Sequence, residues 1–303
     1  MMHIFKTFEL LSYFICMGAY VFRTMLATQQ LRTMIAITDR WTKVFLVSFS
    51  VLSISSIVLF SLRIQVMSGA TFVDAFSYLM PIFKETHYGS IFILRLMLLV
   101  FLGVCLLIHT KKQSYTIDIC MLTLIIGIGY TFSAVSHAAD NGSFSVSELI
   151  DWLHVISTAT WGGSILITLL VFYKNIPREF LEQKINIAVF ISKLSTVCAY
   201  ALLVVLLTGF YKIQSILNNG MPLWYTNYGH LLGFKLIFVT LLMGFGVMNR
   251  YISLPRVARW ASRSNNMSHN TLQFFICVLI AQVCTVLIIL AISSSLIDHS
   301  PTF

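Results

Sequence analysis

The stretch GSIFILRLMLLVFLGVCLLIH, residues 89–109, is almost wholly apolar and holds a single Lys, Arg, Asp or Glu, which is Arg95. About 20 mostly apolar residues let a helix cross the hydrocarbon core of a membrane, because each residue advances the helix by about 1.5 Å. This stretch therefore predicts a membrane-spanning helix. Seven further stretches meet the same criterion: residues 9–28, 44–66, 117–138, 148–173, 187–212, 229–250 and 271–295.

The composition of the whole chain indicates the same class of protein. Of its 303 residues, 58% are hydrophobic and only 10% are charged, and the mean hydropathy is +0.86. Soluble domains carry about a quarter charged residues, and so few charges could not cover a soluble fold of this hydrophobicity. We predict an all-α polytopic membrane protein. Residues 1–303 would form a single integral membrane domain of eight transmembrane helices embedded in the lipid bilayer.

Basic residues are concentrated in alternate loops. Segments 23–43, 109–116, 174–193 and 250–270 hold 14 of the 20 Lys and Arg residues, whereas the segments on the other side hold four. The positive-inside rule places the basic segments in the cytoplasm, and therefore both termini in the periplasm. The formal net charge of +9 is then a property of cytoplasmic loops, and we expect no nucleic-acid partner.

A short sequence pattern occurs twice. T-x-Y-G-x5-[RK]-L begins at Thr86, where the third span starts, and again at Thr226, 140 residues later, where the seventh span starts. Each half then holds four spans, an even number, so both halves enter the membrane from the same side. We predict two parallel four-helix repeats, residues 1–140 and 141–303.

The pattern places one cation inside each of the two spans. Arg95 and Lys235 lie about six residues from the start of the span, or about 9 Å deep. An unpaired cation at that depth is costly, so we predict that Arg95 approaches Glu9 and that Lys235 approaches Asp151. The alternative is that both side chains extend to the outer membrane interface.

Histidine residues gather on the predicted periplasmic side. His137 ends the fourth span, His154 lies about two turns into the fifth, and His230 begins the seventh, so the three share one depth. Imidazole binds copper, zinc, iron and nickel. The three residues are candidate metal ligands, and the alternative is that they anchor the helices at the interface. Cys105 and Cys120 flank one cytoplasmic turn and are candidates for an exit site.

The fifth span contains the densest polar pattern. Ser145-x-x-Glu148 is typical of a capping box, which predicts a helix start near Ser147. From Glu148 onwards, steps of three or four residues place Asp151 and His154 on one helix face, where Asp151 could orient the imidazole or join a metal site. Trp161, Gly162 and Gly163 predict close helix packing and an aromatic wall.

The same residues carry a resemblance to a known family. Ser136-His137-Ala138-Ala139, Asp151-x-x-His154, Trp161-Gly162-Gly163, Tyr228-Gly229-x5-Lys235-Leu236, Asn249-Arg250 and Pro255 resemble the signature of the copper-resistance protein D (CopD) family. The resemblance is best over residues 130–256, and the eight-span layout extends it to the whole chain. It implies a bacterial inner-membrane protein that moves copper from periplasm to cytoplasm, often beside a periplasmic CopC-like copper carrier. Family members often carry a histidine in the first span, where this chain has Ser12-Tyr13-Phe14.

The functional prediction is copper transport or handling that contributes to copper resistance or homeostasis. Copper would bind His137, His154 and His230, with Asp151 as an orienting or additional ligand, and the first half would act as scaffold. One alternative is a haem b electron-transfer protein that uses the same histidines, and another is a copper sensor or assembly partner. No motif of a known nucleophile or nucleotide site occurs, so we expect no enzyme activity.

Overall fold

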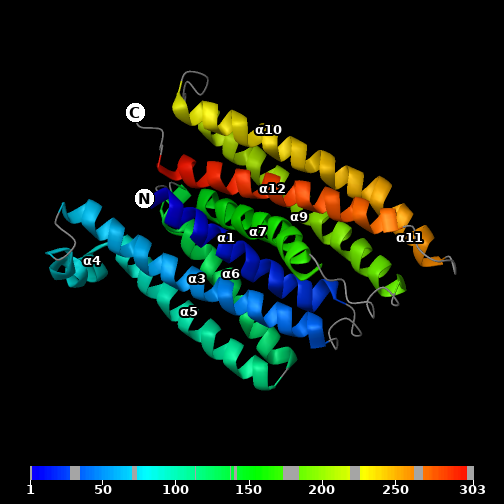
Figure 1. Ribbon diagram of the computed structural model, residues 1–303. Helices are drawn as coiled ribbons and strands as arrows, with labels where there is room; N and C mark the ends of the chain where they lie inside the picture. Colours follow the sequence, from blue (N-terminus) through cyan, green and yellow to red (C-terminus); the bar gives the residue numbers. More distant parts are fainter. Residues whose placement is uncertain are drawn as a thin grey trace.

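The computed structural model describes residues 2–27, 35–69, 74–112, 114–136, 138–139, 142–172, 184–218, 226–262 and 269–298. These residues form helices and short connections, without a β-strand in the described part of the chain (Figure 1). The helices, in chain order, are α1 (Met2–Val21), the π-helical turn η1 (Phe22–Leu26), α3 (Ile35–Ser68), η2 (Asp74–Tyr78), α4 (Leu79–Glu85), α5 (His87–Lys111), α6 (Tyr115–Ser133), α7 (Val146–Phe172), α9 (Lys184–Asn218), α10 (Asn227–Met248), η5 (Asn249–Ser253), α11 (Leu254–Ser262) and α12 (His269–Asp298).

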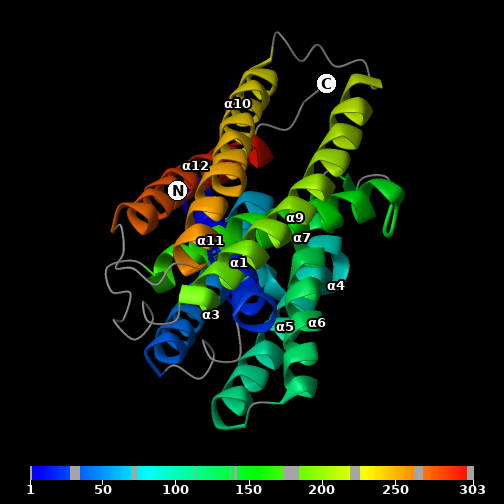
Figure 2. The same cartoon turned by 90° about the vertical axis from the view of Figure 1, so that its right-hand side faces the viewer.

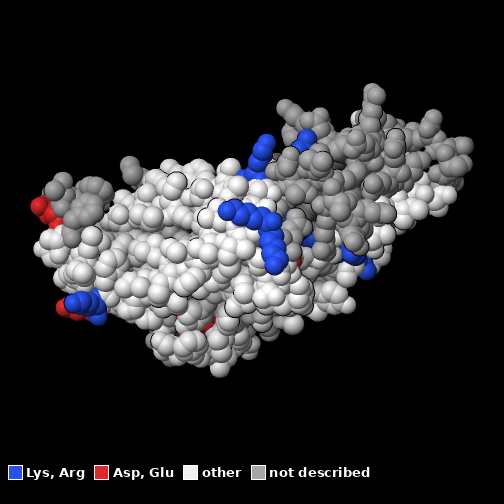
Figure 3. Space-filling view, turned by 90° about the horizontal axis from the view of Figure 1, so that it is seen from below, with Lys and Arg blue, Asp and Glu red and all other residues white. Residues whose placement is uncertain are grey.

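The eight predicted spans are confirmed as helices that are long and apolar enough to cross a membrane. They run over Met2–Leu26, Arg40–Ser68, His87–Lys111, Tyr115–Ser133, Val146–Val171, Ile185–Leu217, Asn227–Ser262 and Gln273–Leu296. Figure 3 shows that broad stretches of the described surface carry neither basic nor acidic side chains. Such a surface suits contact with lipid tails.

Some helix boundaries differ from the prediction. The first span begins at Met2 rather than at residue 9. The fourth ends at Ser133 rather than at residue 138, because the Ser136 amide turns back to donate to the Ser133 carbonyl at 3.0 Å. The seventh continues through η5 into α11, an amphipathic helix that buries Val257 and Trp260. The short helices η2 and α4 were not predicted, because their segment is too short to span a membrane.

The centre of the bundle is a backbone contact between α1 and α7. A Cβ atom added to Gly18 would lie 2.0 Å from the Gly163 carbonyl oxygen, and one added to Gly163 would lie 2.0 Å from the Phe14 carbonyl oxygen. Only glycine fits at both positions, which confirms the close packing predicted for Gly163. Because α1 opens the first half and α7 opens the second, this crossing joins the two halves.

The two halves share most of their helix neighbours. In the first, α1 packs on α3 and α5 on α6, and in the second, α7 packs on α9 and α10 on α12. Across the halves, α1 packs on α12 and α6 on α7. The exception is that α3 contacts α5, whereas the described residues of α9 and α10 hardly touch, and Figure 2 shows these two helices diverging at one end.

The duplicated sequence pattern has the same local structure in both places. Thr86 precedes α5, and its hydroxyl accepts a hydrogen bond from the Gly89 amide at 3.0 Å. Thr226 precedes α10, and its hydroxyl accepts from the Gly229 amide at 3.1 Å. The repeat motif is therefore an N-terminal helix cap in each half, because the threonine oxygen satisfies an amide that has no partner within the helix.

The beginning and the end of the described chain lie at one end of the bundle, which we call the terminal end. There the hydroxyls of Thr7 on α1 and Ser294 on α12 are 2.8 Å apart. At the opposite end, Arg23 lies over the Trp41 ring, 4.6 Å from its centroid, and His109 and Asp118 are 3.3 Å apart. The chain thus enters and leaves the membrane domain on the same side (Figure 1).

Candidate functional site

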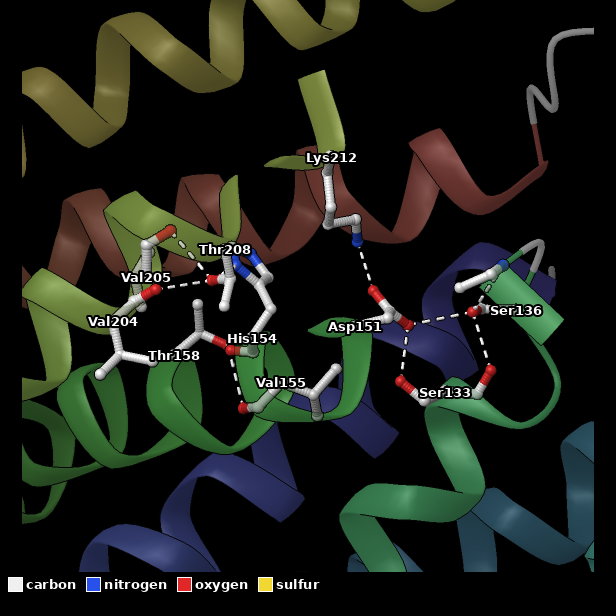
Figure 4. Close-up of polar contacts among 11 residues, drawn as sticks. Ser133, Ser136, Asp151, His154, Val155, Thr158, Val204, Val205, Thr208 and Lys212 are labelled. Carbon is white, nitrogen blue, oxygen red and sulfur yellow. Dashed lines mark hydrogen bonds and ion pairs between the residues drawn. The ribbon is translucent and has the colours of Figure 1, made fainter. Parts of the chain in front are cut away.

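A buried carboxylate near the start of α7 organises the candidate site. Asp151 is 6% exposed, and one of its oxygens, Oδ2, accepts hydrogen bonds from the Ser133 hydroxyl at 2.7 Å and the Ser136 hydroxyl at 3.0 Å. The other oxygen, Oδ1, forms an ion pair with the Lys212 ammonium of α9 (Figure 4). Burial of a charged carboxylate requires such compensation, and here two neutral donors and one cation supply it.

The imidazole of His154 lies one turn further along α7. Its Nδ1 is 2.8 Å from the Thr208 hydroxyl oxygen, again on α9. The Thr208 hydroxyl also donates to the Val204 carbonyl at 2.7 Å, which leaves its oxygen able to accept from an Nδ1–H group of the histidine. In that tautomer Nε2 carries the lone pair. A metal-binding histidine has this same form, with one ring nitrogen held by a hydrogen bond and the other available to the metal.

The site is a short ladder between two antiparallel helices. Asp151 and His154 are three residues apart on α7, and Thr208 and Lys212 are four residues apart on α9, so the pairs Asp151–Lys212 and His154–Thr208 form successive rungs (Figure 4). The spacing on α7 was recognised in the sequence. The residues on α9 were missed, although two polar residues one helical turn apart at the end of an apolar span were a signal.

The predicted cation partners are right in one half and wrong in the other. Arg95 pairs with Glu9 at 2.7 Å, as predicted, whereas Asp151 pairs with Lys212 and not with Lys235. The reason is packing: α9, which carries Lys212, lies directly against α7, whereas the described part of α10 makes at most marginal contact with α7. Lys235 still acts electrostatically on Asp151 and on Lys212.

The ion pair of the first half is more completely enclosed. The Arg95 guanidinium donates to the Thr131 hydroxyl at 2.8 Å and to its carbonyl at 3.0 Å, and it lies 4.4 Å from the centroid of the Phe132 ring. Glu9 also accepts from the Ser56 hydroxyl at 2.6 Å. A planar guanidinium held at several points is a fixed structural element. It joins helices α1, α3, α5 and α6.

The start of α7 explains the role of the acid that precedes the site. The Glu148 amide donates to the Ser145 hydroxyl at 3.3 Å, and the Glu148 carboxylate accepts from the Phe144 amide. Glu148 therefore caps the helix, which begins at Val146, one residue before the predicted start. The cap holds the first turn of α7 in place, and Asp151 follows in the next turn.

The two remaining predicted ligands are His137 and His230. His137 lies outside the described residues, although it follows Ser136, which contacts Asp151. Helix α6 ends at Ser133, before His137 in the chain. His230 is exposed in the first turn of α10. Within the described ranges, no three His, Cys, Asp or Glu side chains are close enough to hold a metal ion. The predicted four-residue site stays a prediction.

The bundle and its polar ladder define a multi-pass membrane protein with an ionisable site near one membrane boundary. Residues 2–146 match the family described as copper resistance protein D-like, N-terminal domain, and residues 188–294 match copper resistance protein D. The chain belongs to the copper resistance protein D family. This membership fits the bacterial inner membrane. No curated protein and no solved structure matches the chain.

The two matched segments leave a gap that contains the α7 residues of the candidate site. Asp151 and His154 fall between residues 146 and 188, so their assignment rests on geometry. An imidazole and a carboxylate on one face of α7 are ligand types that bind transition metals such as copper, zinc and iron. Haem b gains no support, because the residue that faces His154 from α9 is Thr208 rather than a second histidine.

Proposed function

We propose that the protein carries copper across the bacterial inner membrane from the periplasm to the cytoplasm, and so contributes to copper resistance or homeostasis. The observation that carries the proposal is that Asp151 and His154 lie on one face of α7, where Thr208 holds Nδ1 of the imidazole and Lys212 pairs with the carboxylate. Membership of the copper resistance protein D family supports copper as the cargo. The role is that of a transporter, with no catalysed reaction.

In this proposal the terminal end of the bundle faces the periplasm. The basic loops would then lie in the cytoplasm, as the positive-inside rule requires. Arg95 links Glu9 to Thr131 near the end of α6, and Ser133 contacts Asp151, so the candidate site belongs to the terminal end. Copper would therefore arrive from the periplasm, either free or from a CopC-like carrier.

The second half would perform the binding and the first half would support it. Asp151 and His154 would be the first ligands, and His137, next to Ser136 in the chain, and His230 on α10 would complete the site. Sparse contact between α9 and α10 would allow α10 to bring His230 closer. The matching helix caps at Thr86 and Thr226 support the interpretation of the halves as parallel repeats.

The test is to replace His154 by alanine in the full chain. We expect the variant to accumulate in the membrane but to lose copper binding and copper uptake by right-side-out vesicles, whose outer face is the periplasmic face. Ser157→Ala is the matched control, because Ser157 is a buried neighbour on the same helix, 7% exposed, outside the ladder. Normal copper uptake by His154→Ala would refute the assignment. Loss of a Soret band would instead indicate haem.

A further inference from the structure

We propose that Lys212 is a tethered counter-cation that copper must displace from Asp151 before the site can load. The inference rests on the proposed function and assigns to that site a built-in competitor. Lys212 would thereby set the copper concentration at which the protein binds its cargo.

The two oxygens of Asp151 have different partners. Oδ2 already accepts two hydroxyl hydrogen bonds, from Ser133 and Ser136, while Oδ1 faces the Lys212 ammonium. Oδ1 is therefore the oxygen that remains for a metal. A metal ion and an ammonium group repel each other, and they cannot both occupy the same carboxylate oxygen.

The Lys212 ammonium also lies in the path of an ion that enters the site. Lys212 and Thr208 lie one turn apart on α9, and Thr208 orients His154, so the ammonium lies along the same α7–α9 seam as the imidazole (Figure 4). An ion that bridges His154 and Asp151 must enter this seam. The ion meets the positive charge of Lys212 there. Lys235 also acts electrostatically on His154 and on Asp151. Both lysines therefore oppose the entry of a further cation until one of them moves.

Lys212 is able to leave the carboxylate. Its side chain is 41% exposed, whereas the Asp151 side chain is 8% exposed, so protein atoms do not enclose the ammonium. Lys212 lies near the end of its span at Leu217, and its long side chain can extend from there to the membrane interface. The cation that pairs with the buried acid of the first half, Arg95, cannot do so. The Arg95 side chain is only 9% exposed and donates to Glu9 and twice to Thr131. A flexible lysine with one acidic partner is displaceable, and a multiply bonded buried arginine is not.

The experiment titrates Cu(II) into the purified full-length protein in lipid nanodiscs, because an imidazole–carboxylate donor set suits Cu(II). Lys212→Gln removes the competing charge and should bind Cu(II) about ten-fold more tightly than the parent. Lys212→Arg keeps the charge and adds hydrogen bonds, so it should bind about ten-fold more weakly. Lys84→Gln, at an exposed lysine of α4, should bind like the parent.

A second measurement detects the displacement in the unaltered protein, with His154→Ala as its control. Copper should raise the rate at which an amine-reactive reagent labels Lys212, because the displaced ammonium enters water, and His154→Ala should abolish this increase. Equal labelling with and without Cu(II), or equal affinity of the Gln and Arg variants, would overturn the inference. In those outcomes the proposed function survives if His154→Ala still loses copper. It fails separately if His154→Ala binds copper normally.

Discussion

The Thr208 hydroxyl holds the His154 ring at one of its nitrogens. The hydroxyl oxygen lies 2.8 Å from Nδ1, and the hydroxyl donates a hydrogen bond to the Val204 carbonyl at 2.7 Å, which favours the tautomer with the proton on Nδ1 and the lone pair on Nε2. A residue that no metal would touch thereby decides which nitrogen of the histidine can bind one.

Thr208→Val should therefore weaken copper binding by about 10-fold to 100-fold, the usual cost of losing the group that orients a metal-binding histidine. The change keeps the shape of the side chain and removes only its hydroxyl group. Affinity for Cu(II) measures the effect. Thr158→Val is the control, since the Thr158 hydroxyl bonds to carbonyls of its own helix. Equal loss in both variants would contradict the orienting role.

Reporter fusions test the orientation of the bundle. Fusions at Thr110 and Ser262 should report a cytoplasmic location, and a fusion at Gly142 should report the periplasm, because the basic loops adjoin the first two positions. A periplasmic signal from Ser262 would reverse the topology and place Asp151 at the cytoplasmic side.

The glycine crossing can be tested by adding one methyl group. Gly163→Ala should lower the thermal stability of the protein, at a cost of about 1–3 kcal/mol, because the new Cβ would meet the Phe14 carbonyl of α1. Gly244→Ala on α10 is the matched control. Its Cβ would have no neighbour within 4 Å in the described structure, and alanine favours the helix by about 1 kcal/mol over glycine. Equal melting temperatures for the two variants would contradict the close contact.

Loss of the enclosed ion pair should cost more than loss of an exposed charge. Arg95→Gln leaves the Glu9 carboxylate buried without its cation, and we expect a destabilisation of about 3–5 kcal/mol. Arg63→Gln, at an exposed arginine of α3, should be mild. Thermal unfolding in detergent measures both. The double variant Glu9→Gln/Arg95→Gln should be more stable than Arg95→Gln alone, because it removes the unpaired carboxylate. Equal stability of the two would show that the unpaired carboxylate does not cause the destabilisation.

The sequence contained most of the fold because membrane helices are specified locally. Each span is a continuous apolar run, so its position could be predicted without knowledge of its neighbours. The boundaries were less accurate, because polar contacts such as the Ser133–Ser136 turn end α6 early. Helix α4 was missed for a related reason. Its Phe83 stacks on Phe60 of α3, with ring centroids 5.1 Å apart, and a hydropathy criterion does not detect such a tertiary contact.

The candidate site was predicted where it depended on one helix and missed where it depended on two. Asp151 and His154 could be placed on one face of α7 from their spacing alone. The partners on α9 depend on which helix packs against α7, and the repeat suggested Lys235 instead of Lys212. That suggestion failed because α10 stands away from α7 while α9 lies against it.

The contact of Gly18 with Gly163 also bears on how such a protein could change shape. At this point the backbones of α1 and α7 are in direct contact, without side chains between them. Side chains therefore cannot change rotamer there to accommodate a shift of one helix along the other. We expect the position of α1 relative to α7 to stay unchanged during any conformational change. A change in helix position would then occur at the periphery of the bundle, where the described residues of α10 make few contacts with α9.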